Sequence, residues 1–181
     1  SRASMALMAA EELGIDVYSI TPVVADTEAV GFTDVTEGSR ATFATGKAVV
    51  EACRELKVEL CRRAAQIMGV DEAEVEWVDG AAVSPNHGGE PLTLAAITAQ
   101  AKRTGGPLTA TASLNAAGAG PSFAVHCADV KVDEETGQTA IVRYTAVQDA
   151  GTAIHPSYVE GQMQGGSVQG IGWALNEEYI F

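Results

Sequence analysis

The 181-residue chain contains few cysteines, and their spacing excludes the common cysteine-based sites. Cys53, Cys61 and Cys127 form no CxxC pair, which argues against zinc and iron–sulfur motifs. An odd number of cysteines also argues against a disulfide framework and fits free thiols in a reducing compartment. We therefore expect a cytoplasmic protein whose own sequence supplies no ligands for an iron–sulfur cluster.

Basic residues are scarce as well. The chain has 11 Lys and Arg against 24 Asp and Glu, for a formal net charge of -13. Nucleic acids and anionic membranes bind clustered Lys and Arg, so we expect neither as a partner. In the glycine-rich stretch at residues 148–178, Glu160, three glutamines and Asn176 interrupt the apolar run well before the roughly 20 residues that a membrane span needs, so no membrane span is expected.

The sequence has enough apolar residues for one sizeable domain or two small ones, because 46% of its residues are hydrophobic and 19% are charged. Predicted helices and hairpins alternate without a regular βαβ order, which favours an α+β fold. Periodicity and turn signals predict helices over residues 3–13, 41–68 and 93–102, and another that begins near His155-Pro156. They predict strands over residues 15–20, 74–78, 81–83, 109–114, 123–132 and 139–148. Residues 21–40 and 115–121 are expected to be irregular, and Asp79-Gly80 to form a type I′ turn.

The most unusual stretch runs from Gln148 to Glu178. It places five glycines (Gly161, Gly165, Gly166, Gly170 and Gly172) among small, apolar and amide residues at mostly helical spacing. Each interior glycine costs a helix about 1 kcal/mol relative to alanine, so something must compensate. A strip without side chains lets another backbone or a flat ligand come close. The spacing alone leaves both interpretations open: a tight helix-packing seam, or a surface that touches a cofactor.

Two motifs together resemble a known family. T-E-G-S-R-A-T-F-A-T-G-K-A-V spans residues 36–49, and D-A-G-T-A-I-H-P-x-x-V-E-G-Q-M-Q-G-G-x-V-Q-G-I-G-x-A-L-x-E-E spans residues 149–178. Both resemble the molybdopterin-binding large subunit of the xanthine dehydrogenase and aldehyde oxidoreductase family. The resemblance covers the whole chain in order and implies that residues 1–181 form part of a molybdopterin-binding domain, a fragment of a longer subunit.

The resemblance implies a cofactor site made of Gly38, Ser39, Arg40, Ala41 and Gln162. The turn at residues 38–41 would bind the pyrophosphate of a pterin dinucleotide, since a hydroxyl, a guanidinium and free amides at a helix N-terminus form an anion site. Gln162 would contact the pterin, because its amide both donates and accepts hydrogen bonds. From the residues alone, Ser39 could equally be an ordinary helix N-cap.

The chain departs from the family pattern in several places. Family members commonly have Asn where this chain has His155, and often a second hydroxyl residue where it has Ala41. The family's G-Q-G loop near the metal would fall before Ser1, and its catalytic glutamate would fall beyond Phe181. We therefore expect no catalytic residue in this chain. We expect no metal ligands either, because the three histidines are not at metal-ligand spacing.

The resemblance also implies a reaction and partners. The expected reaction is the oxidative hydroxylation of an aldehyde or N-heterocycle, with oxygen from water and electrons passing to iron–sulfur clusters in a partner or missing region. The expected cofactor is molybdopterin with molybdenum, either as the plain pterin or as its cytosine dinucleotide. Expected partners are the rest of the large subunit, an iron–sulfur subunit, an FAD subunit and a small-molecule substrate. The isolated chain is expected to be inactive. The alternative is a non-catalytic binding or assembly module that keeps the fold without turnover.

Overall fold

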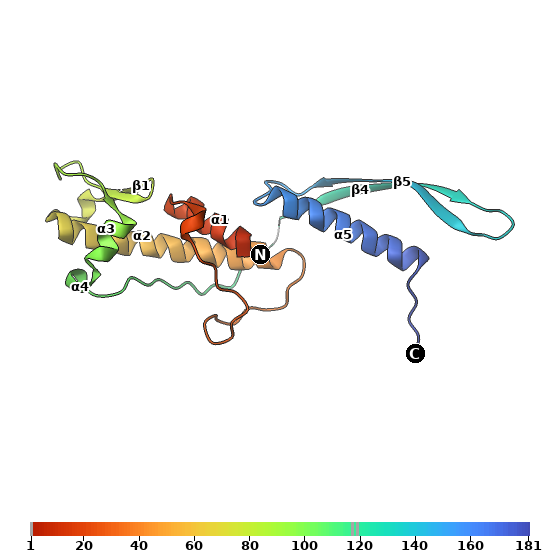
Figure 1. The fold of residues 1–181 in the computed structure, drawn as a ribbon, viewed down its shortest axis with the longest axis horizontal. Coiled ribbons are helices and arrows are strands. Elements are labelled where there is room, and N and C mark those ends of the chain that lie inside the picture. Colours follow the sequence, from red (N-terminus) through yellow and green to blue (C-terminus); the bar gives the residue numbers. More distant parts are fainter. Residues whose placement is uncertain (1, 117, 119) are drawn as a thin grey trace. The chain divides into compact units, whose positions relative to one another are not determined.

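The computed structural model describes residues 2–116, 118 and 120–181 and has an α+β fold made of two units. The first unit covers residues 1–118 and the second residues 119–181. Figure 1 shows their elements: α1, α2, α3, α4 and a small sheet in the first unit, and the long β4–β5 hairpin with α5 in the second.

Helix α2 (Gly46–Met68) is the element on which the first unit is built. It contacts α1 (Arg2–Leu13) along one part of its length and contacts α3 (Leu94–Ala99), η3 (Glu72–Glu74) and β1 (Glu76–Val78) along another. Its apolar stripe places Leu60 and Ala64 in the core, where both are fully buried. The helix ends at Gly69, whose φ of 71° is left-handed and whose N–H donates to Ala65 O at 2.8 Å.

A three-stranded antiparallel sheet covers the end of α2. β1 pairs with β2 (Ala81–Val83), and β2 pairs with β3 (Leu92–Thr93). Asp79 and Gly80 connect the first two strands with φ values of 47° and 79°, as the predicted type I′ turn requires. Ala82 of this sheet and Ile97 of α3 (Leu94–Ala99) are fully buried in the same core as Leu60.

The second unit consists of a long hairpin and one helix. β4 (Phe123–Val132) pairs antiparallel with β5 (Thr139–Asp149), with a register shift between Asp129 and Val130. The hairpin turn is closed by Asp133, whose carboxylate accepts hydrogen bonds from the N–H groups of Glu135 and Thr136. Helix α5 (Pro156–Leu175) follows and contacts β5. Pro156 begins the helix, where its missing N–H is not needed.

Several predicted elements differ in the structure. Residues 15–20 were predicted to be a strand, but Val17–Ser19 form a 3-10 turn, because the Asp16 carboxylate accepts a hydrogen bond from Tyr18 N–H at 2.9 Å. Residues 109–114 form no strand within the described residues. The predicted helix 93–102 is divided at Gln100 into α3, which Thr93 caps, and α4 (Ala101–Thr104). The long helix begins with a π-helical segment, Ala41–Thr45, before α2.

Two further sequence predictions concern the irregular stretch at residues 115–121 and the absence of a membrane span. The predicted irregular stretch 115–121 includes Ala117 and Ala119, which lie outside the described residues. Its other positions have no regular structure. Over the described part of the chain, no helix is both long enough and apolar enough to cross a membrane.

Candidate cofactor site

The turn at residues 38–41 carries four of the five predicted site residues and leads directly into the π-helical segment. Gly38 and Ser39 both have left-handed backbones, with φ values of 49° and 60°, and Arg40 is right-handed with φ −55° and ψ −37°. Arg40 N–H donates to Glu37 O at 2.7 Å, and Thr42 and Phe43 N–H groups donate to Ser39 O. The chain therefore reverses sharply and starts its helix within three residues.

This geometry leaves backbone donors available. In the described part of the chain, the N–H groups of Gly38, Ser39 and Ala41 have no recorded acceptor. The Ser39 hydroxyl likewise caps no helical N–H, since the residue that precedes the helix is Arg40 and it has no side-chain cap. Successive amides in left- and right-handed conformations form a concavity that binds anions, and the positive end of the helix dipole adds to it.

The Arg40 guanidinium lies in the same turn and keeps its charge uncompensated. Its Nη1 donates to the Thr33 hydroxyl at 3.1 Å. Among the described residues no carboxylate forms an ion pair with it, whereas Arg54, Arg62, Arg63 and Arg143 all have such partners. An unpaired guanidinium beside free amides and a hydroxyl is a donor set suited to a phosphate or pyrophosphate. The residues present therefore fit the nucleotide end of a pterin cofactor.

Gln162 belongs to the second unit, on α5, and its side chain is exposed. Positions i, i+3, i+4 and i+7 share a helix face, which groups Gln162 with Gly165, Gly166 and Gln169. A Cβ added at Gly165 or Gly166 would meet no atom within 4 Å. Nothing in the described second unit therefore packs on this strip, and the helix-packing seam considered for the glycines is not formed there.

A different part of α5 packs inside its unit. Val159, Met163, Ser167 and Ile171 recur at four-residue intervals and are buried or half-buried. The Ser167 hydroxyl donates to Met163 O at 2.8 Å, which satisfies it within the helix. Gln162 and its neighbours are thus on the outward part of α5. The structure does not bring Gln162 and the 38–41 turn into one described body, because they lie in separate units.

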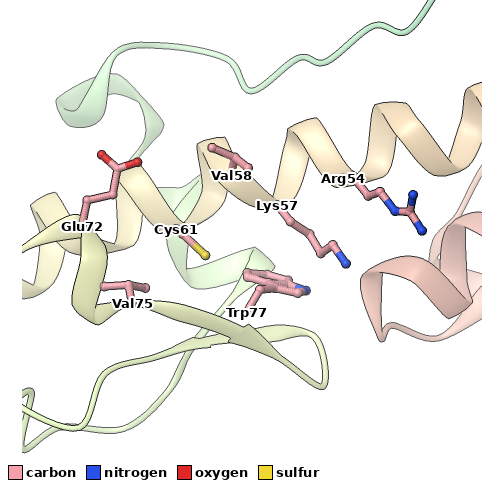
Figure 2. Close-up of a pocket in the computed structure, with 7 residues that line it drawn as sticks. All are labelled: Arg54, Lys57, Val58, Cys61, Glu72, Val75 and Trp77. Carbon is pink, nitrogen blue, oxygen red and sulfur yellow. The ribbon is translucent and has the colours of Figure 1, made fainter. Parts of the chain in front are cut away.

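The first unit also contains a shallow pocket of about 330 Å³ beside the middle of α2. In Figure 2 the side chains of Lys57 and Cys61 reach from α2 toward Trp77 of β1. Its cations are already paired: Lys57 bonds to Glu12, and Arg54 lies 3.0 Å from Glu51. The hydrogen bond from Lys57 holds the pKa of Glu12 below its ordinary value. The pocket therefore offers no free positive charge to an anion.

Cys61 in this pocket is not poised for chemistry. Burial raises the pKa of its thiol, and the nearby Glu72 carboxylate raises it further. A protonated thiol is a weak nucleophile and a weak metal ligand. Over residues 2–116, 118 and 120–181, no group of three or more His, Cys, Asp and Glu side chains could hold a metal ion. The 38–41 turn is consequently the better candidate for a ligand.

Comparison with known proteins identifies the family. The family model described as "Molybdopterin cofactor-binding domain" matches residues 1–181. The chain belongs to this family. The α+β prediction and the predicted resemblance to molybdopterin-binding large subunits are therefore confirmed.

Relatives of this molybdopterin-binding domain are much longer chains. The xanthine dehydrogenase molybdenum-binding subunit of Escherichia coli O157:H7 is 30% identical over 178 residues, which cover 96% of this chain and 24% of that subunit. The carbon monoxide dehydrogenase large chain of Hydrogenophaga pseudoflava is also 30% identical, over 95% of this chain and 22% of its own length. The chain thus spans about a quarter of the length of these relatives.

Solved structures agree with this assignment. Quinoline 2-oxidoreductase from Pseudomonas putida 86 superimposes with a TM-score of 0.80 at 25% identity, over 99% of this chain and 24% of that one. A Cu,Mo-CO dehydrogenase structure gives a TM-score of 0.77 at 26% identity, over 91% of this chain and 21% of that one. The first of these neighbours is named as an oxidoreductase, and the second as a dehydrogenase that contains copper and molybdenum.

Sequence reasoning missed one feature of the candidate site, the contact between Thr33 and Arg40. The two residues are seven apart in a stretch without periodicity. Threonine is common in loops, so no sequence signal marks this residue as a partner of the arginine. Only the folded turn brings the hydroxyl and the guanidinium together.

Proposed function

We propose that this chain is the molybdopterin-binding portion of a molybdenum hydroxylase large subunit, and that residues 1–181 form a partial cofactor-binding domain. The observation that carries the proposal is the 38–41 turn, whose free amides and unpaired Arg40 lie in a chain that matches the family along its whole length. Such a donor set suits the phosphates of a cytosine dinucleotide form of the cofactor.

The proposed site residues would bind the two ends of the cofactor separately. The amides of Gly38, Ser39 and Ala41 and the Arg40 guanidinium would hold the phosphates, and Ser39 adds a hydroxyl donor. Gln162 would donate to and accept from the pterin ring, and Gly165 and Gly166 beside it would let the flat ring approach the α5 backbone. These residues bind and orient the cofactor, and the reacting groups belong to other parts of the enzyme.

The proposed reaction is the hydroxylation of an aldehyde or N-heterocycle. When bound, the molybdenum cofactor supplies a two-electron oxidation in which a substrate C–H becomes C–OH and water provides the oxygen. The electrons would pass to iron–sulfur clusters in a partner subunit and on to an FAD subunit. The cytoplasm is the proposed location, because the cysteines of this chain, Cys53, Cys61 and Cys127, are free thiols.

The rest of the large subunit is the first proposed partner. On the second unit, Phe123, Val125 and Val147 of the hairpin are each more than 60% exposed. Apolar side chains gathered on an exposed face mark an interaction surface. We expect this exposed apolar face to pack against other parts of the large subunit. We also expect the isolated chain to be catalytically inactive.

The test is Arg40→Ala in the complete subunit, with release and quantification of the pterin nucleotide and of molybdenum per polypeptide. A charge-assisted contact is worth about 1.5 to 3 kcal/mol, so we expect cofactor retention to weaken at least about tenfold. Lys47→Ala is the matched control, because it removes one exposed positive charge near the start of α2 that has no recorded ion pair within the described residues. Equal cofactor content in the two variants would reject the proposed anion site.

A further inference from the structure

Arg40 is the only member of the proposed anion site whose long side chain must be oriented before it can bind. An arginine side chain has many accessible rotamers, so an exposed guanidinium with no partner would spend little time in one geometry. In this structure one recorded contact restrains it, the hydrogen bond from Nη1 to Thr33 Oγ1 at 3.1 Å.

The chemical identity of that partner matters. The chain is strongly acidic, and Asp34 and Glu37 lie between Thr33 and Arg40 in the sequence. A carboxylate partner would orient the guanidinium but would also neutralise it, as happens where Glu59 pairs with Arg62 at 2.7 Å. A threonine hydroxyl is a neutral acceptor. It therefore fixes one edge of the guanidinium and leaves the positive charge and the remaining N–H donors for a ligand.

The contact also restrains the backbone around the turn. Thr33 and Arg40 are seven residues apart, and the segment between them contains the left-handed Gly38 and Ser39. A side-chain bond across this segment closes it into a loop at the point where the amides become available. Both effects prepare the turn to bind an anion without adding to or subtracting from its charge.

We propose that Thr33 is a positioning residue for the cofactor: its hydroxyl orients the Arg40 guanidinium toward the phosphates while leaving its charge uncompensated. The inference rests on the proposed function, because it assigns to Thr33 a role that is exercised only through Arg40. It does not require Thr33 to touch the cofactor.

The experiment compares Thr33→Val, Thr33→Ser, Arg40→Ala and the double variant Thr33→Val/Arg40→Ala in the complete holoenzyme. The readout is the rate at which the pterin nucleotide is lost from the purified protein during incubation in mild urea, measured as nucleotide retained per polypeptide. Thr33→Val keeps the shape of the side chain and replaces only the hydroxyl, with a methyl group. Thr21→Val is the matched control, since Thr21 lies in the same irregular stretch and has no recorded side-chain hydrogen bond among the described residues.

We expect Thr33→Val to speed cofactor loss about three- to tenfold, which is the scale of one solvent-exposed hydrogen bond between the guanidinium and a hydroxyl. Thr33→Ser should restore the wild-type rate, and Thr21→Val should not change it. The double variant should lose cofactor no faster than Arg40→Ala alone, because without the guanidinium the hydroxyl has nothing to orient.

The outcomes separate the inference from the proposed function. If Arg40→Ala speeds cofactor loss and Thr33→Val does not, Thr33 has no positioning role and the proposed function stands. Fully additive effects of the two substitutions, or a failure of Thr33→Ser to restore the rate, would also overturn the inference. If Arg40→Ala itself leaves the rate unchanged, the anion site of the proposed function is wrong, and the role of Thr33 with it.

Discussion

Gly80 shows at the level of one residue how tightly the first unit is assembled. Its φ is +79°, and a Cβ placed on it would lie 2.5 Å from the backbone oxygen of Gly14, at the end of α1. A left-handed backbone and a contact with another backbone both favour glycine, since neither can be relieved by moving a flexible side chain. The hairpin turn therefore packs directly on the turn that follows α1.

Gly80→Ala is expected to lower the free energy of unfolding by about 1 to 3 kcal/mol, because it adds both backbone strain and a steric clash. Urea unfolding followed by circular dichroism measures the change. Gly31→Ala is the control, since a Cβ there meets nothing within 4 Å and its φ is not left-handed. If Gly80→Ala were as stable as Gly31→Ala, the result would contradict the close contact between the backbones of Gly14 and Gly80.

At the scale of an element, α2 carries an ion-pair network on its less apolar side. Arg62 Nε donates to Glu59 at 2.7 Å, and the buried Arg63 contacts the same carboxylate. Arg63 also donates to the Thr104 hydroxyl at 3.2 Å and to Gly106 O at 3.4 Å, which ties the end of α4 to α2. The hydrogen bond from Arg62, supported by Arg63, lowers the pKa of Glu59 to about 2.

This pKa has a consequence for stability. Because the folded-state value is below the ordinary 4.5, ionised Glu59 stabilises the fold above about pH 4.5, and the contribution is lost as the pH falls toward 2. We expect Glu59→Gln to cost about 1 to 2 kcal/mol at pH 7 and much less near pH 2.5, after allowance for partial solvent screening.

Urea unfolding of wild type and Glu59→Gln across this pH range measures the effect. Glu55→Gln is a suitable control, because Glu55 is exposed on the same helix and has no recorded ion pair in the described residues. A stability difference between wild type and Glu59→Gln that stayed constant from pH 7 to pH 2.5 would contradict the assignment.

Elements with a strong periodic pattern could be predicted from the sequence, and isolated ones could not. The stripe that contains Leu56, Leu60 and Ala64 correctly located α2, and two β-rich runs joined by the turn signal at residues 133–137 located β4 and β5. Residues 15–20 have strand-like composition, but a side-chain bond from Asp16 selects a 3-10 turn, and β propensity counts only where a neighbouring strand is available.

The candidate site was predicted from a family resemblance and not from periodicity or composition. The resemblance to a family pointed to Gly38, Ser39, Arg40, Ala41 and Gln162, and their binding roles remain predictions. The left-handed backbone of Ser39 and the Thr33 contact are products of folding within an irregular stretch. Neither has a periodic or compositional signal, so the sequence alone could not supply them.

At the scale of the whole molecule, the two proposed parts of the cofactor site lie in different units, and α5 supplies the second part. The glycine strip on α5 costs helix stability, and the described second unit places nothing against Gly161, Gly165, Gly166 or Gly170. The helix stability that these glycines remove would be offset if a bound ligand packs against the strip. We therefore expect substitutions at this strip to change stability and cofactor retention in opposite directions.

Gly166→Ala tests whether stability and cofactor retention change in opposite directions. Gly166 follows Gln162 by four residues and shares its face, so an added methyl should obstruct the pterin and reduce the cofactor content of the complete subunit. In the apo protein the same change should stabilise α5 by about 0.5 to 1 kcal/mol. Gln164→Ala is the control: Gln164 is exposed on the same helix, and a step of two residues turns an α-helix by about 200°, so it lies on the opposite side from Gln162. Equal cofactor content in both variants would argue against a pterin on this face.

We propose that the 38–41 turn binds the phosphates of the cofactor. The decisive measurement is an experimental structure of the complete, cofactor-loaded subunit, which gives the distances from the phosphate oxygens to the amide nitrogens of Ser39 and Ala41 and to the Arg40 guanidinium. We expect at least two of these distances to lie within hydrogen-bonding range, about 2.7 to 3.2 Å. Phosphates bound by other residues, with none of these donors in contact, would contradict it.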